Sequence, residues 1–220
     1  MKQGDSHPLW DLPTRLFHWL LVLCLLLSWW TGEEGQFERH EWLGYTVFVL
    51  VLFRVIWGFI GSRHSMFSDF VRGPVSVWAY IKGRDSGSRG HNPLGGWSVL
   101  VLLSVLLVQV ISGMFNSDDL MFDGPFYFAA SVEFRDTMGV IHEQAFNVLL
   151  ALVALHLTAV FYYQWIKKMP LLQAMIKGKA EGRVGTGPVT SVWRALIVIV
   201  VIAGLLWWAI SLAPQPQPMW

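Results

Sequence analysis

The fold of this chain is decided by residues 139–166, GVIHEQAFNVLLALVALHLTAVFYYQWI. The stretch is long and apolar enough for a membrane-spanning helix, which needs about 20 mostly apolar residues. It carries two histidines, His142 and His156, although ionisable side chains are costly inside a membrane and usually functional. Their 14-residue spacing is close to four helical turns, so we expect both imidazoles on one face, about 21 Å apart along the axis.

Four further stretches satisfy the same criterion, at residues 14–31, 41–61, 95–115 and 191–213. Only 14% of the 220 residues are charged, against about a quarter in soluble domains. The sequence therefore predicts an all-α integral membrane protein with a four-helix transmembrane bundle and a fifth, C-terminal transmembrane helix. No small-x-small cleavage site follows the first stretch, so we expect it to be a retained span.

Two units are expected along the chain. Residues 1–180 would form the four-helix domain, including a loop at 62–94 whose apolar residues predict a short amphipathic helix at the membrane surface. Residues 181–220 would form the fifth span and a Pro-rich tail.

Charged residues alternate in sign from one connecting segment to the next. Acidic side chains dominate two segments: Glu33, Glu34, Glu38 and Glu41, then Asp118, Asp119, Asp123, Glu133 and Asp136. Basic side chains dominate the other three: Lys2 and Arg15; Arg63, Arg72, Lys82, Arg84 and Arg89; Lys167, Lys168, Lys177, Lys179, Arg183 and Arg194. Because basic loops stay in the cytoplasm, the N-terminus is predicted inside and the C-terminus outside.

Four histidines lie in or beside the predicted spans: His18, His40, His142 and His156. The alternating direction of the spans places His18 and His156 near the inner surface, and His40 and His142 near the outer surface. Two pairs follow, each joining two helices at one depth, as in cofactor sites of four-helix bundles. The pattern predicts two haems, each bound by two axial imidazoles that leave no open iron position.

The single cysteine, Cys24, lies within an apolar run. One cysteine excludes a disulfide framework, a Cys-rich metal site and a Cys-x-x-Cys-His haem attachment. We therefore expect both haems to be of the b type, bound without covalent links.

Further residues fit the edges of the two haems. Arg15 lies one turn before His18, and Arg54 lies 14 residues after His40, at the predicted inner level. Both are candidates to pair with haem propionates. Gly44, one turn after His40, is a candidate for close approach of the macrocycle.

Alternatives remain open at each of these positions. Arg54 could instead extend to the inner headgroups, and Gly44 could serve ordinary helix packing. Arg39 and Arg135 flank the outer pair. His64 is the first substitute if one assigned ligand is wrong.

Three motifs carry a resemblance to a known family. They are Leu16-Phe17-His18-Trp19, then His40 with Gly44 and Arg54, then His142-Glu143 with Leu155-His156. Together they resemble the bacterial cytochrome b561 and Ni/Fe-hydrogenase cytochrome b family over about residues 8–180. The fifth span and the enlarged loop 62–94 depart from the smaller members and indicate a partner subunit.

The resemblance implies a dihaem core in the bacterial inner membrane that exchanges electrons with a quinone, with His18, His40, His142 and His156 as iron ligands. The expected partners are membrane lipid, quinone and a periplasmic c-type cytochrome or other redox subunit, with no nucleic acid. Whether the chain is an electron-transfer protein or an oxidoreductase subunit stays open.

The acidic outer segments favour a basic cytochrome partner over a superoxide:ubiquinone oxidoreductase, because superoxide is an anion. A cytochrome b subunit of a hydrogenase or reductase complex remains an alternative. So do an anchoring subunit with structural haems and, less readily, a zinc or copper site.

Overall fold

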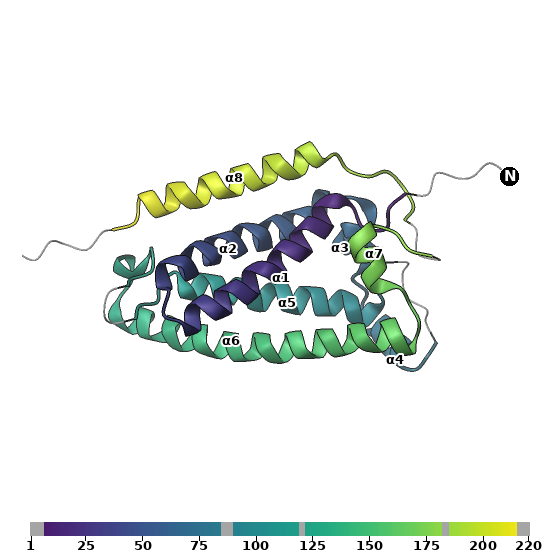
Figure 1. Cartoon of the computed structure of the whole chain (residues 1–220), viewed down its shortest axis with the longest axis horizontal. Helices are drawn as coiled ribbons and strands as arrows, with labels where there is room; N and C mark the ends of the chain where they lie inside the picture. The colour runs from purple at the N-terminus through teal and green to yellow at the C-terminus, as the bar shows by residue number, and fades with distance from the viewer. Residues whose placement is uncertain (1–6, 85–89, 119–121, 182–184, 215–220) are drawn as a thin grey trace, which may run out of the picture.

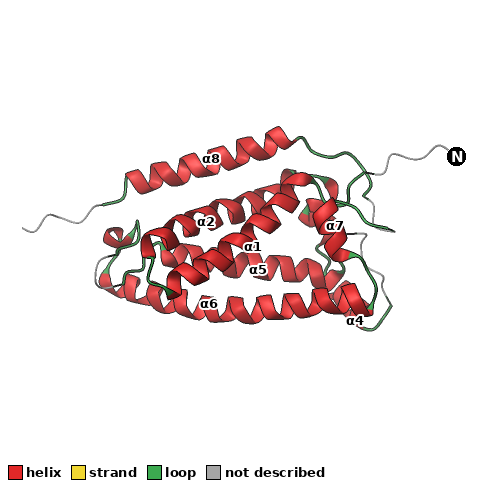
Figure 2. Cartoon of the chain, in the orientation of Figure 1, coloured by secondary structure: helices red, strands yellow, loops and turns green. Residues whose placement is uncertain are grey.

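The computed structural model describes residues 7–84, 90–118, 122–181 and 185–214, and its regular elements are helices (Figure 2). Five helices are long and apolar enough to cross a membrane, which confirms the predicted fold class. They are α1 (Leu12–Glu33), α2 (Phe37–Ile60), α5 (Pro93–Gly113), α6 (Val132–Phe161) and α8 (Val192–Ser211). Lys2, Arg89, Asp119, Arg183 and the tail from 215 onward lie outside the described residues.

α1 and α5 begin two residues earlier than the apolar pattern predicts, and two other helices begin earlier still. α2 starts at Phe37 rather than 41, and α6 starts at Val132 rather than 139. Ser131 caps α6, its side chain accepting a hydrogen bond from the Phe134 amide at 3.3 Å. The first turn of each helix carries two charged residues, Glu38 and Arg39 in α2 and Glu133 and Arg135 in α6, so hydropathy alone misses it.

Four of the five long helices form a bundle of two antiparallel pairs (Figure 1). α1 packs along α2, α5 packs along α6, and the pairs meet where α2 contacts α5. The core is centred on that contact and includes the buried side chains Val51, Phe53, Trp57, Leu103 and Leu106. α8 lies on the outside of α2, and its side chains Ala195 and Ile202 are part of the same core.

The connecting segments collect at two ends of opposite charge. We call the end with Arg63, Arg72, Lys82 and the α6–α8 connection the basic end, and the end with Glu33, Glu34, Glu38 and Glu133 the acidic end. Figure 1 shows α1 beginning at the basic end.

Short helices build the basic end. They are η1 (Arg63–Ser65), α3 (Phe67–Phe70), α4 (Pro74–Ile81), the π-helical segment η3 (Tyr162–Ile166) and α7 (Leu171–Lys177), while the short η2 (Tyr127–Ala129) lies at the acidic end. α4 confirms the helix predicted within loop 62–94, and it leaves Val75, Trp78 and Ile81 exposed. The Tyr80 hydroxyl lies 2.7 Å from that of Tyr163, tying α4 to η3. Burial, and then this hydrogen bond, raise the pKa of Tyr80 to about 12, so the Tyr80 hydroxyl stays protonated at neutral pH.

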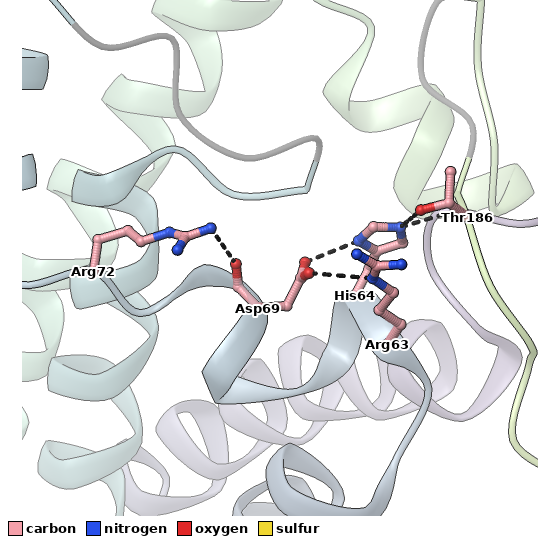
Figure 3. A network of polar contacts seen from close by, with 5 residues as sticks. All are labelled: Arg63, His64, Asp69, Arg72 and Thr186. Atoms are coloured by element: carbon pink, nitrogen blue, oxygen red, sulfur yellow. Dashed lines mark hydrogen bonds and ion pairs between the residues drawn. The ribbon is translucent and has the colours of Figure 1, made fainter.

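A polar network joins the α7–α8 connection to the loop after α2 (Figure 3). His64 is buried, and its Nδ1 lies 2.9 Å from Asp69 Oδ2 while its Nε2 accepts from the Thr186 amide at 3.0 Å. The Thr190 amide donates to Ser62 Oγ at 2.9 Å. Asp69 thus holds the His64 ring through Nδ1, and the ring holds the chain that leads to α8 through Nε2.

Candidate functional site

The histidines at the acidic end come from two helices that belong to different pairs. His40 lies in the first turn of α2 and His142 in α6. Their ring centroids are 6.3 Å apart, and the ring planes are nearly perpendicular at 80°. The structure therefore brings together the two side chains that the topology predicted to be neighbours.

Each of these imidazoles is held by a backbone carbonyl of the neighbouring helix. His40 Nδ1 lies 2.8 Å from the Ser28 carbonyl oxygen of α1, and His142 Nδ1 lies 2.9 Å from the Gln109 carbonyl oxygen of α5. A carbonyl oxygen only accepts hydrogen bonds, so both Nδ1 atoms carry the proton and both Nε2 atoms are left with a lone pair. Histidines that bind metals are commonly oriented in this way.

The Gln109 side chain also reaches His142, its Nε2 lying 3.1 Å from the imidazole Nε2. The Gln109 amide donates this hydrogen bond, and the lone pair on His142 Nε2 accepts it. This contact joins α5 to α6.

The histidines at the basic end are also close to one another. His18 lies in α1 and His156 in α6, near enough for their charges to interact. His18 stacks edge-on with Trp19 at 5.0 Å, and its Nδ1 is buried without a hydrogen-bond partner.

The two arginines predicted near this pair differ in their surroundings. Arg15 donates from Nη1 to the Ile176 carbonyl at 2.7 Å. Arg54 is only 3% exposed, and its guanidinium carbon lies 5.2 Å from the ring centre of Phe67 and 5.8 Å from that of Phe70. Arg54 is thus turned into the protein rather than extended to the surface, and Asp11 is the acid that interacts with its charge.

The remaining candidates lie around the acidic-end pair. A Cβ added at Gly44 would meet nothing within 4 Å, so open space adjoins α2 there. Arg39 donates to Gln36 Oε1 at 2.6 Å, whereas Arg135 lies over the Tyr127 ring at 4.0 Å. The open space at Gly44 suits a bulky group better than ordinary close helix packing.

Buried polar atoms without a partner gather beside both histidine pairs. Arg15 Nε, His18 Nδ1 and Arg54 Nη1 lie towards the basic end, and Ser28 Oγ, Gln109 Oε1 and Arg135 Nε towards the acidic end. Such atoms are rare in folded proteins, because each costs about 1–3 kcal/mol. Their positions fit two bound groups with a metal centre and a polar edge, as a haem has.

Within the described ranges, no group of three or more His, Cys, Asp or Glu side chains converges on one point. The pairs lie at opposite ends of the bundle, in agreement with their 14-residue spacing on α6. A shared zinc or copper site with four histidines is therefore not favoured.

Several residues around the pairs carry no sequence signal that marks them. The Ser28 and Gln109 carbonyls are backbone groups, which any residue type supplies. Gly32 and Gly113, which adjoin the imidazoles, stand out only as glycines that follow a hydroxyl residue.

Comparison with known proteins gives a family. Residues 9–178 match the family described as prokaryotic cytochrome b561. The chain is similar to the probable Ni/Fe-hydrogenase 1 B-type cytochrome subunits of Escherichia coli K12 and Escherichia coli O157:H7. Each is 27% identical over 140 residues, which cover 49% of this chain and 59% of the relative. The match thus spans less than two thirds of either relative, and no solved structure matches the chain.

The family match covers α1, α2, α5 and α6 with all four histidines. It ends just after α7 and does not include α8. The resemblance found in the sequence is thereby confirmed. This chain belongs to the prokaryotic cytochrome b561 family and is a multi-pass membrane cytochrome of the b type that serves electron transfer.

Proposed function

We propose that the protein carries electrons through two b haems, one bound by His40 and His142 and the other by His18 and His156. The observation that carries the proposal is the geometry of the acidic-end pair. Metal–imidazole bonds are about 2.0–2.1 Å long, so two imidazoles on opposite sides of one metal have centroids roughly 6 Å apart. The observed separation is 6.3 Å.

Bound haem would supply one-electron chemistry at each level of the bundle. Two imidazole ligands for each haem would leave no open position on the iron, which would favour electron transfer over oxygen binding. At the basic end, Arg15 and Arg54 would pair with propionates through the nitrogens that now lack partners. Gly44 would leave room for the macrocycle near His40.

We further propose that the protein lies in the bacterial inner membrane with its N-terminus in the cytoplasm. Basic residues concentrated at one end support this orientation. Residues 1–180 would form the electron-transfer domain, and 181–220 the additional span and tail. A quinone would exchange electrons with the haem at the basic end.

At the acidic end we propose a periplasmic c-type cytochrome as the partner. Exposed carboxylates at Glu33, Glu34 and Glu38 would attract a basic protein by electrostatic steering. The hydrogenase-subunit relatives favour a second candidate, in which the partner is a redox subunit of a larger complex.

The test is a redox-titrated visible spectrum of the purified protein with a pyridine haemochrome count. Two b haems per chain with low-spin bands are expected. His142→Ala should retain one haem, because only the acidic-end pair loses a ligand. His7→Ala, which lies outside the bundle, is the matched control and should retain both.

A colourless protein made with ample haem would refute the proposal. Two haems retained in His142→Ala would refute the assignment of the outer ligands. The partner is tested separately, by following reduction of a basic c-type cytochrome in the presence of a quinol.

A further inference from the structure

We propose that two hydroxyl–glycine dipeptides, Thr31-Gly32 and Ser112-Gly113, are positioning residues that orient the imidazoles of His40 and His142. The inference rests on the proposed function of these histidines as the ligands of one haem. It goes further in assigning their orientation to two equivalent sets of groups on α1 and α5. We call each set a seat: the dipeptide together with the backbone carbonyl four residues before its glycine, Ser28 on α1 and Gln109 on α5.

The first element of each seat is a glycine against which the imidazole lies. A Cβ at Gly113 would come within 2.8 Å of His142 Cε1 and 3.1 Å of its Nδ1. A Cβ at Gly32 would lie 3.3 Å from His40 Nδ1 and 3.4 Å from its Cε1. The first spacing is shorter than real Cβ contacts, so Gly113 is the stricter requirement.

The second element is the carbonyl four residues before each glycine. His40 binds the carbonyl of Ser28 and faces Gly32, and His142 binds the carbonyl of Gln109 and faces Gly113. In a helix, a side chain covers the turn that precedes its own Cα. Absence of a side chain at the glycine therefore uncovers the carbonyl one turn earlier, which is the group that the imidazole reaches.

The third element is a buried hydroxyl that shares the same carbonyl. Thr31 Oγ1 donates to the Leu27 carbonyl at 2.8 Å and to the Ser28 carbonyl at 3.1 Å. Ser112 Oγ makes the equivalent pair of contacts on α5, to the Val108 carbonyl at 2.7 Å and the Gln109 carbonyl at 3.0 Å.

The two seats are thus equivalent, although the helices that carry them differ in sequence elsewhere. Ser112 Oγ also lies 3.3 Å from His142 Nδ1, so the hydroxyl limits how far that ring can turn. Together the seats fix the proton on both Nδ1 atoms and hold the ring planes at 80°. If both rings bind one haem iron in this orientation, their nearly perpendicular planes would make two iron d orbitals nearly equal in energy, and the low-spin EPR signal would be strongly anisotropic.

The experiment compares Gly113→Ala and Gly32→Ala with Gly204→Ala, the same change in α8 where a Cβ meets nothing within 4 Å. We expect Gly113→Ala to bind one haem instead of two or to lose the anisotropic outer-haem EPR signal. Gly32→Ala should keep two haems with a shifted signal, and Gly204→Ala should match the unchanged protein. Retained helicity by circular dichroism shows that each variant is folded.

A second measurement does not depend on haem. Nitrogen NMR of histidine-labelled, haem-free protein should show His142 protonated at Nδ1, and this tautomer should be lost in Gly113→Ala. Loss of both the outer haem signal and the tautomer supports the seats. An unchanged outer signal and tautomer in Gly113→Ala overturns them.

The same data separate the two claims. If the protein binds no haem but His142 keeps its Nδ1 proton only when Gly113 is present, the seat stands and the proposed function fails. If haem binds normally and neither glycine variant changes the tautomer or the EPR signal, the proposed function stands and the seat fails.

Discussion

At the scale of single residues, Arg54 is a buried charge within the bundle. Its side chain is buried in the span α2, and it makes no hydrogen bond among the described residues. A buried charge is tolerated only when something compensates for lost hydration. The rings of Phe67 and Phe70 and the charge of Asp11 supply part of the compensation, and a haem propionate would supply the rest.

This assignment predicts the effect of Arg54→Gln on redox potential. Removal of a positive charge beside the basic-end haem stabilises the ferric state, so its midpoint potential should fall by about 60 mV, which for one electron is about 1.4 kcal/mol. The acidic-end haem should not shift. A potentiometric titration followed in the visible spectrum measures both values.

Arg63→Gln is the control, because Arg63 is exposed and pairs with Asp69 at 3.7 Å. Equal shifts in both variants, or no shift in Arg54→Gln, would mean that Arg54 does not contact the haem.

At the scale of secondary-structure elements, α8 is held by specific polar contacts as well as by its apolar face. The segment that precedes it donates two backbone amides to side chains of the α2–α3 connection, His64 and Ser62. His64 was kept as a substitute ligand from sequence. The structure instead places it in a polar network at the basic end, with Asp69 at its Nδ1 and the Thr186 amide at its Nε2.

We therefore predict that His64→Ala loosens the connection to α8 and leaves the haem count unchanged. Loss of the acceptor leaves the Thr186 amide unsatisfied at a cost of about 1 kcal/mol, which corresponds to a several-fold increase in local opening. The measurement is the rate of limited trypsin cleavage at Lys179, an exposed site in this connection.

Ser76→Ala in α4 serves as the control and should leave cleavage unchanged. If the His64→Ala protein is cut at the control rate, the network does not hold α8. If it loses a haem while remaining folded, His64 is closer to the cofactor than we propose.

At the scale of the whole molecule, the charge asymmetry of the two ends dominates. Each long helix starts at one end and finishes at the other, so the acidic connections gather together and the basic ones gather opposite. The fold thereby converts an alternation along the sequence into two oppositely charged faces. An acidic face accelerates association with basic proteins, with gains of about 10–1000-fold that fall with salt.

Neutralisation of this face should slow electron transfer to its partner. Combined Glu33→Gln, Glu34→Gln and Glu38→Gln changes should lower the rate of reduction of a basic c-type cytochrome about tenfold at low ionic strength. The difference should shrink as salt is added, because screening removes the attraction. Stopped-flow absorbance of the soluble cytochrome measures the rate.

Glu181→Gln is the matched control at the basic end and should not change the rate. Reduction at an unaltered, salt-independent rate in the triple variant would exclude steering by this face.

Sequence predicted much of the architecture because its main determinants are local. Five apolar stretches give five spans, and the regular 3.6-residue helix relates His142 to His156 without any tertiary information. Helix starts were less well predicted, since the first two turns of α6 carry the charged residues Glu133, Arg135 and Asp136, which lower the hydropathy there.

By itself, then, the sequence determined the fold class, the family and the histidines that belong to each end, because periodicity and span direction follow from chain order. Tertiary structure alone decided which groups meet them: the carbonyls of Ser28 and Gln109, the glycines beside each imidazole, and the Asp69 contact that occupies His64. Backbone carbonyls are the same in every residue, and contacts between distant segments depend on how helices pack. Such partners leave no pattern in chain order and become visible only once the helices are placed side by side.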